Sequence, residues 1–189
     1  MDKVENLSAL TKDEALETLN RTIGFVNNCD SKSSVILGIF GVMITILFSG
    51  EGINGLKFII KSAITEGTTC GAFYFILLFI AFATLGYGNY KLLMVLFANT
   101  NCGDKNQDGL ESDSKIFFGS ISKNVNFKQY KEKLYTYSEE DYLNDIISQI
   151  YINSIICNEK FENYKRGMKI SIIGFLAFVF IWGLGIIVY

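Results

Sequence analysis

The sequence predicts an all-α membrane protein, with three transmembrane helices and a helical cytoplasmic region. Three apolar runs, 33–50, 67–90 and 170–189, contain no Asp, Glu, Lys, Arg or Pro. Each has roughly the 17–25 residues that an α-helix needs to cross a hydrocarbon core. A polar stretch of helical character, 91–169, separates the second run from the third. Its longest predicted helix is expected to continue without a break into the third span.

The distribution of basic residues predicts the orientation of the chain. Four basic residues precede the first run, only Lys57 and Lys61 lie in the segment 51–66, and the rest lie in or beside 91–169. The positive-inside rule therefore places residues 1–32 and 91–169 in the cytoplasm, and Tyr189 on the far side of the membrane. The segment 51–66 is too short and too charged to span, so we interpret it as an extracytoplasmic loop or an interfacial helix.

Composition excludes most catalytic chemistry. The chain contains no histidine, so it has no imidazole base, no Ser–His or Cys–His pair and no His-ligated zinc. Its four cysteines show no C-x-x-C spacing, which argues against a metal or redox site. The net charge of −2 does not indicate a surface that binds nucleic acid. We expect no enzyme, catalytic residue, metal or cofactor.

One stretch imitates a calcium site. Four residues match the first half of an EF-hand loop: Asp104, Asn106, Asp108 and Gly109. The twelfth position, which should be a bidentate Glu, is Lys115, and an ammonium group there would repel the ion. We therefore interpret this stretch as a solvated loop.

Local sequence patterns predict a helix before the first span and a packing face within that span. Thr11 and Glu14 form a capping box, followed by apolar residues at heptad spacing, which predicts an amphipathic helix running toward the first span. Within the span, Gly38 and Gly41 lie on one face together with Ser34 and Thr45. Stripes of small residues allow close helix packing in lipid, so we expect this face to contact another helix.

The most regular helix is predicted to begin after a second capping box, Ser138 and Asp141, and to run from Glu139 through Gly167 into the third span. An apolar heptad stripe follows its length and should pack against the N-terminal helix or against another copy of the protein. The stripe comprises Leu143, Ile147, Ile150, Ser154, Cys157, Phe161, Tyr164 and Met168.

A neighbouring face of this helix is polar and admits two interpretations. It carries Tyr142, Gln149, Asn153 and Lys160. The face could simply be solvated. It also offers what a nucleotide requires, namely amides for a base edge, a ring for stacking and an ammonium group for a phosphate.

Several short motifs, in this order, resemble the Pycsar effector family. They are Asp30-Ser31-Lys32 before the first span, Ile116-Phe117-Phe118-Gly119, Tyr130, Tyr137-Ser138-Glu139-Glu140, Gln149-Ile150-Tyr151-x-Asn153-Ser154 and Lys160-Phe161. The resemblance covers roughly 16–189. It implies a membrane-spanning effector of the bacterial inner membrane that a partner pyrimidine cyclase activates through cUMP or cCMP during phage infection. Such effectors impair the membrane, so that growth stops or the cell dies. The stretches 51–66 and 101–113 depart from the simpler forms of the family.

The two lines of argument together give an expected site. We assign Lys160 to the phosphate, Gln149 and Asn153 to the base or ribose, and Tyr151 and Phe118 to stacking. Asp30 and Lys32 either extend their charges toward the membrane surface or line the same site.

The expected partners are membrane lipid, one cyclic mononucleotide and further copies of the chain, which would associate through the heptad stripe. Which of the two nucleotides binds stays open at this point. The competing function is a constitutive holin-like pore, or a structural membrane anchor, with no nucleotide ligand. Dependence on a ligand separates the two.

Overall fold

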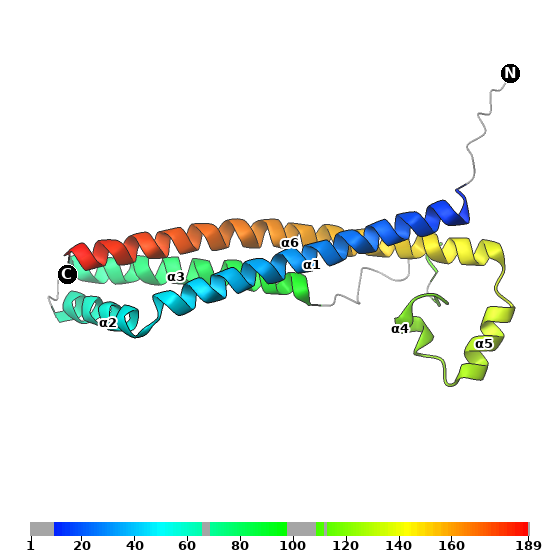
Figure 1. Ribbon diagram of the computed structural model, residues 1–189, viewed down its shortest axis with the longest axis horizontal. Helices are drawn as coiled ribbons and strands as arrows, with labels where there is room; N and C mark the ends of the chain where they lie inside the picture. Colours follow the sequence, from blue (N-terminus) through cyan, green and yellow to red (C-terminus); the bar gives the residue numbers. More distant parts are fainter. Residues whose placement is uncertain (1–9, 66–68, 98–108, 112, 189) are drawn as a thin grey trace, which may run out of the picture. The chain divides into compact units, whose positions relative to one another are not determined.

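The protein is all-α throughout the part described by the computed structural model, residues 10–65, 69–97, 109–111 and 113–188. Its helices are α1 (Lys12–Leu47), α2 (Gly50–Thr65), α3 (Thr69–Leu96), α4 (Phe118–Ile121), α5 (Phe127–Tyr135) and α6 (Glu139–Val188), shown in Figure 1. α1, α3 and α6 are long and apolar enough to cross a membrane. The predicted all-α class and the continuity of the long helix with the third span are confirmed.

The chain forms two compact units. The first comprises residues 1–27 and 99–158, and the second comprises 28–98 and 159–189. α1 and α6 each contribute one part to each unit. The second unit therefore contains the three apolar runs, and the first contains most of the polar stretch. The half-matching calcium loop falls largely outside the described residues, since 98–108 are not described.

Both predicted capping boxes are confirmed. The Thr11 backbone N donates to Glu14 Oε2 over 2.9 Å, and the Glu14 backbone N donates to Thr11 Oγ1 over 3.3 Å. At the start of α6, the Ser138 N donates to Asp141 Oδ2 over 3.0 Å, and the Asp141 N donates to Ser138 Oγ over 3.1 Å. These bonds satisfy backbone donors that the first turn of a helix otherwise leaves unpaired.

The first unit is held together by a small apolar core between α1 and α6. Ala15 and Leu19 of α1 pack against Ile146 of α6, and the partly buried Leu143 and Ile150 adjoin them. Two other members of the predicted heptad stripe are exposed, Ile147 in this unit and Phe161 in the second. The stripe differs from expectation because α6 turns a polar face inward in this unit, with Asp145, Ser148 and Gln149 buried beside Ile146.

The second unit has a core rich in aromatic residues. Phe178 and Trp182 of α6 lie against Leu78 and Ala81 of α3 and Ile59 of α2. The outward faces carry many exposed large apolar side chains, including Phe73, Phe79 and Phe180. Exposure of such a surface to water is unfavourable, whereas lipid chains can cover it. The segment expected as a loop or interfacial helix forms α2, which packs on α3.

Close helix packing in the second unit depends on glycines other than those expected. A Cβ added at Gly88 of α3 would lie 2.4 Å from the backbone N of Ser171, and one at Gly174 of α6 would lie 2.4 Å from the backbone N of Leu85. The expected packing residues Gly38 and Gly41 are exposed, and an added Cβ at either would meet no described atom within 4 Å. Bulky residues around Phe40 make the contacts of α1 instead.

Candidate functional site: a buried carboxylate in the polar unit

The centre of the first unit's polar network is Asp145, two turns into α6. Its side chain is fully buried. One oxygen, Oδ2, accepts hydrogen bonds from the Tyr137 hydroxyl over 2.7 Å and from the Lys115 backbone N over 2.7 Å. The other oxygen, Oδ1, has no hydrogen-bond partner among the described residues. Burying a carboxylate oxygen without a hydrogen-bond donor costs free energy, so a donor that reaches Oδ1 would be bound favourably.

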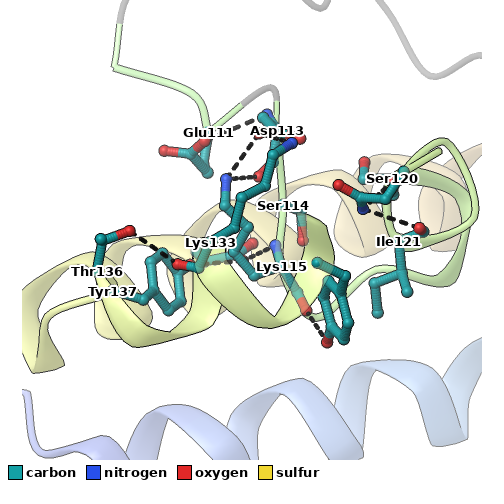
Figure 2. A network of polar contacts seen from close by, with 12 residues as sticks. Glu111, Asp113, Ser114, Lys115, Ser120, Ile121, Lys133, Thr136 and Tyr137 are labelled. Atoms are coloured by element: carbon teal, nitrogen blue, oxygen red, sulfur yellow. Dashed lines mark hydrogen bonds and ion pairs between the residues drawn. The ribbon is translucent and has the colours of Figure 1, made fainter. Parts of the chain in front are cut away.

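Side chains fasten the segment 113–117 to its surroundings (Figure 2). In addition to the bond from its N to Asp145, Lys115 accepts a bond at its carbonyl from the Tyr130 hydroxyl over 3.0 Å. Ser114 Oγ accepts from the Phe117 N over 2.9 Å. Just before the segment, the Glu111 N donates to Ser148 Oγ of α6 over 3.1 Å. Both backbone groups of Lys115 are thus held by side chains rather than by a helix.

Two ammonium groups share one carboxylate at the edge of this network. Lys115 Nζ and Lys133 Nζ lie 2.9 Å and 3.0 Å from Asp113 Oδ2, as Figure 2 shows. Hydrogen bonds from both lysines hold the pKa of the Asp113 carboxyl below its usual range. Asp113 is half exposed, so an incoming anion can compete with it. Asp113 and the two lysines by themselves sum to a charge of plus one, but Asp145, Glu111 and Asp141 act on the same network. The feature that suits a phosphate-like ligand is therefore the pair of ammonium groups rather than a net positive charge.

Tyr137 connects the two halves of the network. Its hydroxyl contacts Asp145, and its ring lies 5.7 Å from Lys115 Nζ. Burial, and next the hydrogen bond to the negative Asp145, raise the pKa of the Tyr137 hydroxyl well above its ordinary value. The hydroxyl therefore stays protonated at neutral pH and acts as a hydrogen-bond donor.

The residues expected for nucleotide binding fall into both units. Gln149 is buried one turn after Asp145, and its carbonyl accepts from Asn153 Nδ2 over 2.8 Å. Tyr151 and Phe118 have exposed rings. Lys32 is also exposed, in the second unit. Two of the seven expected residues that lie far apart in the sequence, Asp30 and Lys160, are brought into contact by the structure.

The Asp30–Lys160 pair lies in the second unit, where the Lys160 side chain is buried and that of Asp30 is partly exposed. Lys160 Nζ lies 2.5 Å from Asp30 Oδ1 and donates to the Val95 carbonyl over 2.6 Å. We expected Lys160 to hold a phosphate, but its ammonium already has two oxygen partners.

Sequence reasoning missed Asp145, Lys115 and Lys133 as site residues. The only signal for Asp145 is weak, because the residue precedes two isoleucines, Ile146 and Ile147, but has polar residues at Asn144, Ser148 and Gln149 around it. An acidic residue at such a position is either paired or functional. Lys115 and Lys133 are eighteen residues apart and gave no signal, because only the tertiary fold brings both to Asp113.

The hollows of the second unit do not suit a nucleotide. The larger, of about 480 Å³, is lined by Thr69, Cys70, Phe73, Tyr74 and Leu77, and the smaller, of about 210 Å³, mainly by phenylalanine rings. Both linings are predominantly apolar and offer little to a phosphate or a base edge. Among the residues that the structure describes, no cluster could hold a metal ion.

These features define a class: a multi-span α-helical membrane protein with a separate polar unit that has a buried carboxylate and a cationic cluster. The sequence profile of the Pycsar effector protein domain matches residues 14–188. The chain is also 33% identical, over 187 residues and 92% of each chain, to the Pycsar effector protein GmPycTM of Gulbenkiania mobilis. No solved structure matches it.

This chain therefore belongs to the Pycsar effector family, a family of antiviral defence proteins, as the motifs of its sequence indicated. Family membership supports a role as a membrane-associated anti-phage effector.

Proposed function

We propose that this protein senses a cyclic pyrimidine nucleotide, cUMP or cCMP, and responds by impairing the bacterial inner membrane. A partner pyrimidine cyclase would supply the nucleotide during infection. Membership of the Pycsar effector family supports the signalling context, and three helices long enough to span support the membrane output. The observation that carries the ligand proposal is the fully buried Asp145, of which one oxygen is hydrogen-bonded and the other has no described partner.

The chemistry of the proposed site matches the two ends of a cyclic pyrimidine nucleotide. Asp145 Oδ1 can accept a hydrogen bond from an N–H of the base or a ribose hydroxyl. Lys115 and Lys133 can exchange Asp113 for the phosphodiester anion. Gln149 and Asn153, which follow Asp145 on α6, remain candidates for the base or ribose, as do Tyr151 and Phe118 for stacking.

Binding at this site would require a change of structure. Asp145 is fully buried, so a ligand can reach Oδ1 only after the groups that cover this side chain move. Asp145 lies on α6, which continues into the third span. A ligand that binds the rearranged state about a hundredfold more tightly shifts the equilibrium by about 2.7 kcal/mol per site. Association of several copies would multiply this bias.

The proposed orientation follows the distribution of basic residues. Residues 1–32 and the polar stretch 91–169 would lie in the cytoplasm, where a cyclase product accumulates, and Tyr189 would lie outside. The alternative function, a constitutive pore or anchor, requires no ligand and gives no role to the half-satisfied Asp145.

A thermal-shift titration tests ligand binding. The purified full chain in detergent should gain thermal stability with cUMP or cCMP but not with 5′-UMP or 5′-CMP. At a ligand concentration a hundred times Kd, the gain corresponds to about 2.7 kcal/mol. Asp145→Asn keeps one oxygen for Tyr137 and Lys115 but replaces the other with an NH₂ group, which repels an incoming donor. We expect this variant to fold and to lose at least about tenfold in affinity.

Glu132→Gln provides the matched control, because it removes a charge at an exposed position of α5. It should bind like the unmodified chain. If neither cyclic pyrimidine nucleotide raises the melting temperature, the sensor proposal is wrong and the anchor or constitutive pore gains support. If Asp145→Asn binds with full affinity, the ligand is bound elsewhere.

A further inference from the structure

The buried ion pair of the second unit joins three helices at one point. Lys160 of α6 lies between the Asp30 carboxylate of α1 and the Val95 carbonyl of α3, at 2.5 Å and 2.6 Å. The Lys160 side chain is only 9% exposed, and that of Asp30 is 35% exposed. A single ammonium group thus bonds to both of the other predicted spanning helices.

The contact with α3 has a clear electrostatic basis. Val95 is the penultimate residue of α3, so its carbonyl is among the last four, which have no partner within the helix. These carbonyls form the negative end of the helix dipole, and the last turn of α3 contains no basic residue of its own. Lys160 therefore supplies from another helix the cation that this end attracts.

The Asp30 contact compensates the burial of the Lys160 charge. An ammonium group removed from water is tolerated when an anion and further acceptors surround it, and loss of one partner leaves the other charge uncompensated. Neutralising Asp30 would leave the Lys160 ammonium with neutral oxygen acceptors only, and with no anion to balance its charge among the contacts that the structure describes. The helix arrangement around Lys160 depends on that carboxylate.

The three residues of this contact lie close to the points where the chain passes from one unit to the other. The chain passes between the two units three times, at 27–28, 98–99 and 158–159. Asp30, Val95 and Lys160 each lie within three residues of one of these crossings. These crossings are the covalent connections between the polar unit and the membrane helices, and a member of the contact lies close to each of them.

We infer that Asp30, Lys160 and the Val95 carbonyl form an electrostatic lock that holds α1, α3 and α6 in a non-permeable arrangement, and that activation breaks it. This inference rests on the proposed membrane-impairing function and adds its regulation. It assigns Lys160 a role other than phosphate binding. The two roles predict opposite phenotypes, because a lost lock activates the effector whereas a lost phosphate ligand silences it.

The test is dye release from proteoliposomes that contain the full chain, without nucleotide and then with cUMP or cCMP. Asp30→Asn and Lys160→Met should each release dye without nucleotide, at least about tenfold faster than the unmodified chain, which is a loss of about 1.4 kcal/mol of preference for the closed state. The exchange Asp30→Lys with Lys160→Asp restores the ion pair between α1 and α6 but removes the ammonium group of residue 160 from the Val95 carbonyl. It should release dye more slowly than either single variant and faster than the unmodified chain. Lys165→Gln, at an exposed position of α6 with no assigned role, should behave like the unmodified chain.

Each outcome decides a different question. If the unmodified chain responds to nucleotide but Asp30→Asn is quiet without it, the lock is wrong and the proposed function stands. If Lys160→Met is quiet with and without nucleotide, Lys160 binds the ligand and the lock is wrong. If the unmodified chain never releases dye, the membrane-impairing function itself fails. Slower release from the exchanged pair than from either single variant excludes misfolding of the single variants as the cause.

Discussion

Replacing Asp145 with alanine is expected to destabilise the polar unit by about 3 kcal/mol or more. The substitution leaves two partly buried donors, the Tyr137 hydroxyl and the Lys115 backbone N, without their acceptor. Hydrogen bonds to a charged group contribute about 1.5–3 kcal/mol each, and a donor left unsatisfied adds a desolvation cost. Denaturation of the purified chain, followed by tyrosine fluorescence or circular dichroism, measures the loss.

Two comparisons show whether the hydrogen bonds cause this loss. Asp145→Asn retains an acceptor oxygen and should lose much less stability than Asp145→Ala. Tyr137→Phe removes one donor and should give an intermediate result. The pKa of Tyr137 is raised in the folded chain, so its neutral hydroxyl contributes fully to the free energy of unfolding below about pH 10, the ordinary pKa of tyrosine. This contribution is lost as the pH rises further. Equal stability of Asp145→Ala and Asp145→Asn would contradict this account of the network.

Gly88→Ala is expected to destabilise the membrane unit, although it adds a single methyl group. The new Cβ would lie 2.4 Å from the backbone N of Ser171 and 2.5 Å from its Oγ, so α3 and α6 must separate. Overpacking of this kind costs about 1–3 kcal/mol. Thermal unfolding in detergent or lipid, compared with the unmodified chain, measures the effect.

Gly38→Ala is the matched control, because the same methyl group would meet no described atom within 4 Å. It should leave stability unchanged or raise it slightly through the better helix propensity of alanine. If Gly38→Ala proves as damaging as Gly88→Ala, the exposed face of α1 is an interface in the assembled protein. That result would favour contact between copies through the face that the small-residue stripe of α1 predicted.

The gross architecture could be predicted from sequence because it depends on local patterns. Uncharged apolar runs of sufficient length define spans whatever their partners, and capping boxes act within one turn, so Thr11 and Ser138 were placed correctly. The unbroken α6 follows from the lack of Gly, Pro or a cluster of turn residues between Glu139 and Arg166. None of these inferences needs a tertiary contact.

The candidate site could not be predicted in this way, because it depends on which face of each helix turns inward. Ile147 is exposed while Asp145 is buried, the reverse of what hydrophobicity predicts. One backbone donor, the Lys115 N thirty residues away, and the Tyr137 hydroxyl bond to the buried carboxylate and offset the cost of its burial in part. Likewise, the pairing of Asp30 with Lys160 bridges 130 residues, and no local spacing encodes it.

The central claim is that a cyclic pyrimidine nucleotide switches this protein from a quiet to a membrane-impairing state. Dye release from proteoliposomes of the unmodified full chain, with cUMP, cCMP and their linear counterparts added in turn, tests it most directly. The account predicts release with at least one cyclic nucleotide and none with 5′-UMP, 5′-CMP or buffer. Release that is equally fast in buffer, or no release with either cyclic nucleotide, would contradict it.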